Sequence, residues 1–167
     1  INAAINQVWP DLQLWMSWSH EGQNTLEATK AYIASVEKQI EGGGYPLIGL
    51  CRNTGKFVVA TGLTKTGDSI ETGYWVAREF LGRGYALEAA NAVTRFGFGA
   101  FRLNEIHINH YEGNEKSKHI IQKLGFAFTH TTVEGHARCL DGKLLDVHHY
   151  VMRDVSALPL LNVRWNK

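Results

Sequence analysis

The sequence predicts an α+β (mixed α/β) fold, with helices on both faces of a central, mostly antiparallel sheet. Three strand-like runs follow one another with only turn residues between them, and such runs pair as an antiparallel meander. A strand, a helix and a strand then alternate, which requires a parallel pair. The 167 residues, 44% of them hydrophobic, suffice for one core, so we expect a single domain over residues 1–167.

The first sixteen residues have the spacing of two short helices. Apolar side chains recur at helical intervals between Ala3 and Met16. Pro10 interrupts this pattern, and proline is typical of the first turn of a helix. We therefore expect one helix to end and a second to begin near this residue.

A longer helix is expected between Asn24 and the three glycines at positions 42–44. Asn24 is a typical N-cap residue, and Glu27 three positions later completes a capping box. The helix is expected to have an apolar face that extends to the glycines. That face consists of Leu26, Ala28, Tyr32, Ile33, Val36 and Ile40.

The remaining elements are predicted from changes in the spacing of apolar residues along the sequence. Three strands are expected at residues 45–52, 56–64 and 69–76, then a helix from the glycines near 82 to about Ala100. Residues 106–111 alternate as a strand, and a further helix runs from Asn114 to Gly125. Two last strands, at 127–137 and 144–153, flank a turn at 141–142.

The composition excludes several function classes. A formal net charge of +1 gives no global field that would attract nucleic acid or an anionic membrane, so neither is expected as a direct partner. No apolar run approaches the roughly 20 residues of a membrane-spanning helix. Neither the histidines nor the two cysteines, Cys51 and Cys139, have metal-ligand spacing. We expect no metal, and a reduced, cytoplasmic protein.

A glycine-rich turn between a strand and a helix is the first candidate site. The first N–H groups of a helix lack internal partners, and glycines let a diphosphate reach them. The turn is Leu81-Gly82-Arg83-Gly84-Tyr85-Ala86.

Three interpretations of this turn compete. It is a turn without a ligand, a dinucleotide fingerprint, or the pyrophosphate loop of an acyl-CoA enzyme. The fingerprint lacks its third glycine, because Leu87 stands there, and the Gly-Lys-Ser/Thr of a Walker motif does not occur.

Four motifs in sequence order make the chain recognisable. They are Gly73-Tyr74-Trp75-Val76, then Gly82-Arg83-Gly84-Tyr85-Ala86 with Glu88-Ala89, then Asn114-x-x-Ser117, then Lys123-Leu124-Gly125-Phe126. Together they resemble the GNAT superfamily of N-acetyltransferases, and within it the RimJ/RimL branch, which acetylates the amino termini of ribosomal proteins. The resemblance covers nearly the whole chain.

Two features depart from the family pattern. The first strand of the family is expected before the opening helices and is not found. Glu79 occupies a position where the phosphate motif usually has Gln or Arg, and an acid facing a diphosphate would repel it.

The resemblance implies acetyl-CoA as cosubstrate and no metal. The strand ending at Val76 and the strand at 105–111 are expected to splay apart, with the pantetheine arm pairing with backbone groups in the gap. A backbone N–H there would stabilise the oxyanion of the tetrahedral intermediate. The cofactor-binding residues implied are Trp75, Val76, Ala77, Leu81, Gly82, Arg83, Gly84, Tyr85, Ala86, Asn114, Ser117 and Lys123.

An acetyl-accepting amine must lose a proton before it attacks, so a base is needed. Glu71 is our candidate, because strand alternation directs it to the same face as Gly73 and Trp75. The alternative is an exposed or ion-paired carboxylate without a role in catalysis. Asp146 and Glu112 are further candidates for the base.

The leaving thiolate needs a hydrogen-bond donor. The resemblance implies Ser117, in the first turn of a helix, where negative charge is favoured. The alternative is that Ser117 merely occupies a turn capped by Asn114. Tyr111, at the end of its strand, is the other candidate acid.

The implied acceptor is a primary amine, the N-terminal amino group of a ribosomal protein by branch resemblance. The alternatives are a small amine, such as an antibiotic or a polyamine, and a module that binds acetyl-CoA without catalysis. Trp18, in a polar loop, is expected near the acceptor pocket. The protein is expected to act as a monomer or a homodimer.

Overall fold

The computed structural model describes residues 1–162, which form helices and strands in the predicted order. The helices are α1 (Asn2–Gln7), α2 (Trp9–Trp15), α3 (Leu26–Ala34), α4 (Val36–Glu41), α5 (Tyr85–Phe101) and α6 (Glu115–Leu124), with a 3-10 turn, η1 (Arg78–Phe80). The strands are β1 (Tyr45–Leu50), β2 (Phe57–Thr66), β3 (Ser69–Val76), β4 (Ile106–Tyr111), β5 (Ala127–Ala137) and β6 (Leu144–Met152).

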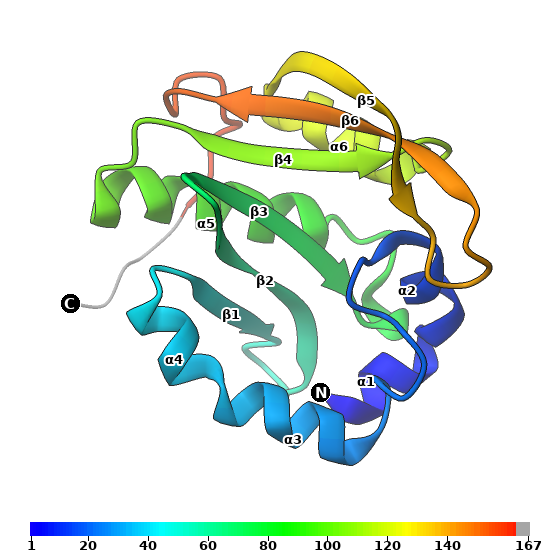
Figure 1. Cartoon of the computed structure of the whole chain (residues 1–167). Helices are drawn as coiled ribbons and strands as arrows, with labels where there is room; N and C mark the ends of the chain where they lie inside the picture. The colour runs from blue at the N-terminus through cyan, green and yellow to red at the C-terminus, as the bar shows by residue number, and fades with distance from the viewer. Residues whose placement is uncertain (163–167) are drawn as a thin grey trace.

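The strands form one mixed sheet in the order β1-β2-β3-β4-β6-β5 (Figure 1). Neighbours are antiparallel except β3 and β4, which are parallel because the chain crosses from one to the other through α5. The prediction of a mostly antiparallel sheet with one parallel pair is confirmed.

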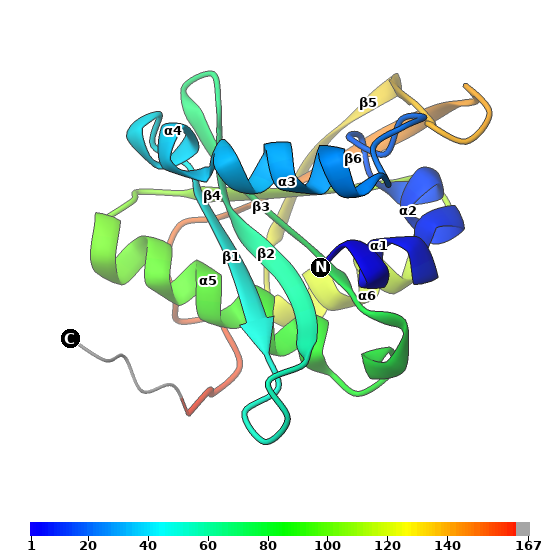
Figure 2. The same ribbon diagram turned by 90° about the horizontal axis from the view of Figure 1, so that it is seen from below.

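Helices cover both faces of the sheet, as predicted. α5 packs on β2 and β3, and α6 packs on β4. α3 lies on the opposite side of the sheet from α5 (Figure 2). The sheet therefore has an α5/α6 face and an α3 face, and the residues of each strand alternate between the two.

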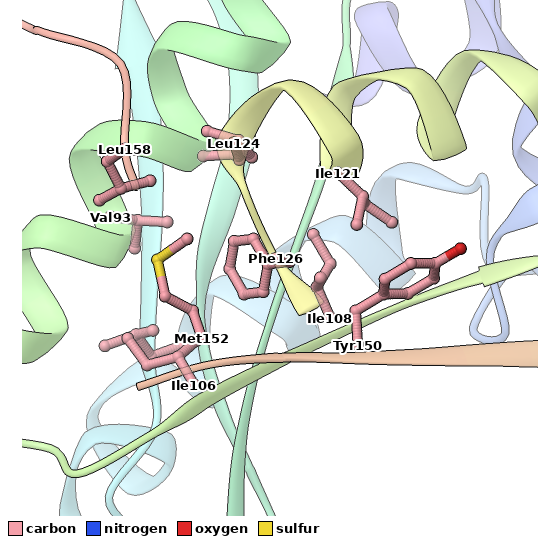
Figure 3. Close-up of a cluster of buried hydrophobic side chains, with 11 residues drawn as sticks. Val93, Ile106, Ile108, Ile121, Leu124, Phe126, Tyr150, Met152 and Leu158 are labelled. Atoms are coloured by element: carbon pink, nitrogen blue, oxygen red, sulfur yellow. The ribbon is translucent and has the colours of Figure 1, made fainter. Parts of the chain in front are cut away.

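The main core lies between the sheet and the α5/α6 layer. Apolar side chains of both helices meet inward-facing residues of β4 and β6 there (Figure 3). Burial of this face fixes the register of the central strands, because a slip of one residue would turn their apolar side chains outward. The cluster consists of Leu63, Ala90, Val93, Ile106, Ile108, Ile121, Leu124, Phe126, Tyr150, Met152 and Leu158.

The predicted cap of the third helix was wrong by one residue. The side chain of Thr25, not Asn24, accepts the first-turn hydrogen bond, from the N–H of Ala28 at 3.1 Å. Asn24 instead donates through Nδ2 to Oδ1 of Asn6, at 3.0 Å. Asn24 thus joins this segment to α1 rather than starting the helix.

The predicted single helix with one apolar face was also wrong. The helix breaks at Ser35, whose hydroxyl donates to the carbonyl of Tyr32 at 2.8 Å. α4 packs on β1, but the two short helices present no common apolar face to the sheet. Leu26, Tyr32 and Ile33 are about half exposed, at 50%, 51% and 51%.

Candidate functional site

The parallel strands β3 and β4 pair over a very short length. Glu71 opposite His107 is the one pair recorded between them within residues 1–162. In a continued parallel register Trp75 would lie opposite Tyr111, but the strands diverge before that point (Figure 1). The second half of β3 therefore faces a gap.

The backbone groups that face this gap follow from the pairing of β3 with β2. The N–H of Ala77 donates to the carbonyl of Val58 at 2.9 Å, and its carbonyl accepts from the N–H of Phe80 at 2.9 Å. In an antiparallel pair, backbone groups point alternately toward the partner and away from it. Tyr74 and Val76 therefore direct their N–H and C=O groups toward the gap.

This corrects part of the sequence-based prediction of freed backbone groups. Ala77 uses both its backbone groups within the chain, and Trp75 has the same orientation toward β2. Of the three residues expected to pair with pantetheine through the backbone, Val76 alone directs its backbone groups toward the gap. Tyr74, which was not expected, directs its groups there as well.

The glycine-rich turn lies just before α5. Gly82 and Gly84 have φ of 73° and 84°, a left-handed conformation that favours glycine. A Cβ added to either residue would meet no atom within 4 Å. The glycines are thus required by the backbone conformation and not by packing, and the turn is open to solvent rather than filled by side chains.

The turn leaves the first N–H groups of α5 without a side-chain partner. Gly84 is the N-cap residue of this 17-residue helix, and no side chain caps it. Arg83 is exposed, with its guanidinium 5.8 Å from the centroid of the Phe80 ring. Bare N–H groups, the helix dipole and an arginine together suit a diphosphate.

Glu79, the acid that departs from the family pattern, is paired. Its Oε2 lies 3.0 Å from Nζ of Lys56, in the turn between β1 and β2, and both side chains are half exposed. Lys56 thus offsets the negative charge that Glu79 brings to this loop.

Tyr74 and Ser117 meet on the α5/α6 face. The Tyr74 hydroxyl lies 3.2 Å from Oγ of Ser117, in hydrogen-bond contact between β3 and α6. Burial raises the pKa of Tyr74 to about 12, with a smaller opposing effect of the Ser117 hydrogen bond. The N–H of Ser117 also donates to Oδ1 of Asn114 at 3.1 Å, so Asn114 caps α6 as predicted. Ser117 thus takes part both in the cap formed by Asn114 and in a contact with Tyr74.

Sequence reasoning assigned no role to Tyr74, although it belongs to the Gly73-Tyr74-Trp75-Val76 motif. The available signal was strand alternation: Tyr74 must face away from Glu71 and Trp75, toward the side on which α6 packs. The pairing with Ser117 itself depends on tertiary packing.

Glu71 lies on the α3 face, on the side of β3 opposite Tyr74. Nδ2 of Asn109, on β4, donates to its Oε2 at 3.3 Å. Tyr111 lies on the same face, and its ring stacks on His136 with centroids 4.0 Å apart at 11°. Burial, and to a smaller extent the charge of Glu71, raise the pKa of Tyr111, while a hydrogen bond with Ser17 lowers it.

Trp75 extends from β3 toward the N-terminal helices. Its ring lies 5.0 Å from that of Phe57, centroid to centroid, and it packs against the apolar cluster of Ile5, Val8 and Leu12. Trp75 thus anchors α1 and α2 beside the gap. Trp18, in the following loop, is exposed, with its ring 6.4 Å from that of Trp9.

Other predicted site residues have different partners. Oδ1 of Asp146 accepts from the N–H of Glu134 at 2.9 Å. Glu112 is exposed beyond the end of β4. Lys123 is exposed in the last turn of α6, six residues and therefore about 9 Å along the helix from Ser117. The structure does not bring Lys123 to the first turn of α6.

The gap thus has different chemistry on its two sides. A carboxylate lies on the α3 face, a tyrosine and a serine hydroxyl lie on the α5/α6 face, and the backbone N–H groups of Tyr74 and Val76 point into the gap between them. Such a site can accept a proton on one side and donate one on the other. Among residues 1–162 no group of three or more His, Cys, Asp or Glu side chains is arranged to hold a metal ion. No helix in this part of the chain has the length and apolar character to cross a membrane.

Comparisons with known proteins identify the family of this chain. The profile of the acetyltransferase (GNAT) domain matches residues 2–127. YdaF of Bacillus subtilis strain 168, whose name assigns it provisionally as a ribosomal N-acetyltransferase, is 32% identical over 103 residues, or 62% of this chain and 51% of YdaF. The match thus spans about half the length of that relative.

Solved structures share the fold. A ribosomal-protein-S5-alanine acetyltransferase from Vibrio fischeri superposes with a TM-score of 0.81 at 18% identity, covering 95% of this chain and 88% of that one. RimL, a ribosomal L7/L12 acetyltransferase solved with coenzyme A, gives 0.78 at 16% identity, covering 91% and 85%. With a family profile matched over most of its length, the chain belongs to the GNAT acetyltransferase family.

Proposed function

We propose that this protein is an acetyl-CoA-dependent N-acetyltransferase, in which a primary amine attacks the thioester directly within a ternary complex. One observation carries the proposal. Glu71 on one face and the Tyr74–Ser117 pair on the other flank the unpaired stretch of β3, beside an uncapped helix N-terminus. Base, oxyanion donor and leaving-group donor thus surround one gap.

The residues of the glycine-rich turn fit the diphosphate of coenzyme A. The N–H groups of Tyr85 and Ala86 begin α5 without a side-chain cap, and open space surrounds Gly82 and Gly84. Arg83 adds a positive charge. From this turn the pantetheine arm would reach the gap, where the backbone of Tyr74 and Val76 supplies amide partners.

The proposed chemistry uses both sides of the sheet. On the α3 face, Glu71 takes a proton from the incoming ammonium group, directly or through water. The amine then attacks the thioester carbon, and the N–H of Tyr74 or Val76 stabilises the negative oxygen. On the α5/α6 face, the hydroxyls of Ser117 and Tyr74 donate to the departing sulfur.

The acceptor we propose is the N-terminal amino group of a ribosomal protein. The sequence relationship to YdaF supports this choice, as does the RimJ/RimL-like order of motifs in the sequence. The catalytic scaffold itself is equally suited to a small amine, because the acceptor is selected by the loops around the site.

An acceptor screen tests the proposal. The protein is incubated with acetyl-CoA and three classes of acceptor: unblocked ribosomal N-terminal peptides, the same peptides acetylated at the N-terminus, and spermidine. Release of free thiol is measured. We expect thiol release with unblocked peptides only.

Two other outcomes have separate meanings. Thiol release with spermidine alone would mean that the acceptor is a small amine, while the proposed acetyl transfer would stand. Stabilisation by coenzyme A in a thermal melt, without thiol release from any acceptor, would indicate a binding module and overturn the proposed enzyme.

A further inference from the structure

The candidate base has an amide neighbour at the point where the strands part. Asn109 lies two residues beyond His107, the residue of β4 that pairs with β3. Both side chains lie on the α3 face, and Nδ2 of Asn109 donates to Oε2 of Glu71 at 3.3 Å. The pair therefore bridges the mouth of the gap.

This hydrogen bond fixes the orientation of the amide. A carboxylate offers only acceptors, so turning the amide by 180° would place two oxygen acceptors together. Oδ1 of Asn109 is therefore directed away from Glu71. It is shielded from solvent and accepts no hydrogen bond from residues 1–162.

A shielded acceptor without a donor needs an explanation. Leaving such a group unpaired costs about 1–3 kcal/mol. In native proteins these groups mark catalytic roles or bound water and ions. Oδ1 of Asn109 lies beside the proposed base, so a donor on the substrate is the natural partner.

The carboxylate of the candidate base, Glu71, is also without an ion-pair partner in the described part of the chain. His107, its cross-strand neighbour, is paired with Glu105, with 3.0 Å between Nε2 and Oε1. The Glu71–Asn109 pair thus presents carboxylate and carbonyl oxygens that suit a cation with several N–H donors.

We propose that Glu71 and Asn109 together form the subsite for the primary ammonium group of the acceptor. This inference rests on the proposed function and assigns the residues that hold its acceptor amine. One N–H of the ammonium group donates to Glu71 and another to Oδ1 of Asn109. A primary ammonium group satisfies both oxygens, whereas a hydroxyl or a quaternary ammonium group does not.

The subsite also specifies the order of events. The ammonium group passes one proton to Glu71, and Asn109 holds the neutral amine while its lone pair attacks. The C–N bond forms and the C–S bond breaks, and the second proton lost by the nitrogen balances the one taken up by the thiolate. Because protein atoms cover Oδ1, we expect the amine to reach it only when the side chains around it move.

Nuclear magnetic resonance tests the subsite on the unsubstituted, coenzyme A-loaded protein. The probe is n-butylammonium chloride, and tetramethylammonium chloride is the control, since it has the same charge but no N–H. We expect a saturable shift of the assigned side-chain amide signals of Asn109 with the first salt only. Equal shifts with both salts, or none with either, would overturn the inference.

Kinetics give a second readout. Asn109→Leu should raise the KM for the acceptor about tenfold or more, which corresponds to about 1.4 kcal/mol, and leave the KM for acetyl-CoA unchanged. Asn104→Leu, the same change at an exposed position before β4, should alter neither. An unchanged acceptor KM in a folded Asn109→Leu protein would contradict the inference.

The two hypotheses fail in different ways. If coenzyme A does not bind at all, the proposed function fails. If it binds and acetylation proceeds while Asn109 does not respond to the amine, only the subsite fails.

Discussion

Glu71 and Tyr74 are three positions apart on β3, and this odd spacing places their side chains on opposite faces of the sheet. The carboxylate is hydrogen-bonded to Asn109, and the phenol contacts Ser117. A proton acceptor and a proton donor are thus held close to one gap without contacting each other. Each can serve a different reactant.

Replacing the proposed base should have a pH-dependent effect. Glu71→Gln removes the group that deprotonates the amine, so turnover should fall by about 10²–10⁴ at neutral pH. The loss should shrink above about pH 8, because an α-amino group then deprotonates unaided. The measurement is kcat against pH, with Glu37→Gln, an exposed carboxylate on α4, as control. A loss that is constant with pH would remove Glu71 from this role.

Tyr74 should have a measurable effect on stability at alkaline pH. Burial raises its pKa to about 12 from 10.0, so between these values the unfolded state loses the proton while the folded state keeps it. The stability from this group is fully present below pH 10 and is lost as the pH rises toward 12. Relative to Tyr74→Phe, the wild-type protein should lose on the order of 2 kcal/mol between pH 7 and 11.5. Urea unfolding at pH 7, 10 and 11.5 measures it, and parallel pH dependence of the two proteins would contradict it.

At the scale of elements, the turn before α5 combines a backbone requirement with a binding role. Gly84 supplies the left-handed residue that starts the helix without a side-chain cap. Gly67, in the turn between β2 and β3, also has a positive φ, of 60°, and open space around it. The two glycines therefore allow the conformational cost of a substitution to be separated from its effect on binding.

Alanine at each glycine should destabilise the fold similarly, by about 1–2 kcal/mol. Only Gly84→Ala should also weaken coenzyme A binding, because its Cβ projects into the space beside the helix N–H groups. Calorimetric titration with coenzyme A measures the affinity, and thermal melts measure the stability. Equal affinity in Gly84→Ala and Gly67→Ala would show that the turn does not hold the diphosphate.

The spacing of apolar residues and the positions of turn residues were sufficient to predict most elements from the sequence. The strand–helix alternation gave the parallel pair, and Asn114 and Gly125 marked the two ends of α6. The predicted face of α3 failed because its amphipathic pattern was read across Ser35, where the helix breaks. Sequence periodicity specifies a face only within an uninterrupted helix.

The elements that carry the candidate site could be predicted from the sequence, but the contacts between its side chains could not. The glycine turn and Glu71 followed from motif and alternation. The contacts of Tyr74 with Ser117 and of Asn109 with Glu71 join segments 43 and 38 residues apart. Such pairs depend on the relative placement of elements, which a single sequence does not encode in any local pattern.

At the scale of the molecule, the crossover through α5 explains why the two halves of the site lie together. β3 ends at Val76 and α5 begins at Tyr85, so the glycine turn lies at the carboxyl end of β3. The gap opens at the same end, because β3 and β4 are parallel and diverge beyond Glu71 and His107. A ligand whose phosphates lie on the turn can therefore extend into the gap.

This arrangement predicts direct transfer rather than an acetylated enzyme. A covalent route would need a nucleophile, and Cys139 is the residue to consider, since its Sγ lies 3.9 Å from Nε2 of His20. However, its sulfur is engaged with the backbone, since it contacts the carbonyls of Met16 and Ser17 at 3.3 and 3.6 Å. If the amine attacks a thioester in the gap itself, both substrates must be bound at once.

Initial rates measured over a grid of acetyl-CoA and acceptor concentrations should therefore give intersecting lines in double-reciprocal plots. Cys139→Ser should retain wild-type turnover, and Cys51→Ser should do the same. Parallel lines, or a protein that gains the mass of one acetyl group on incubation with acetyl-CoA alone, would require a covalent intermediate. If such an intermediate formed, the positions of Glu71 and Tyr74 on opposite faces of one gap would have no catalytic explanation.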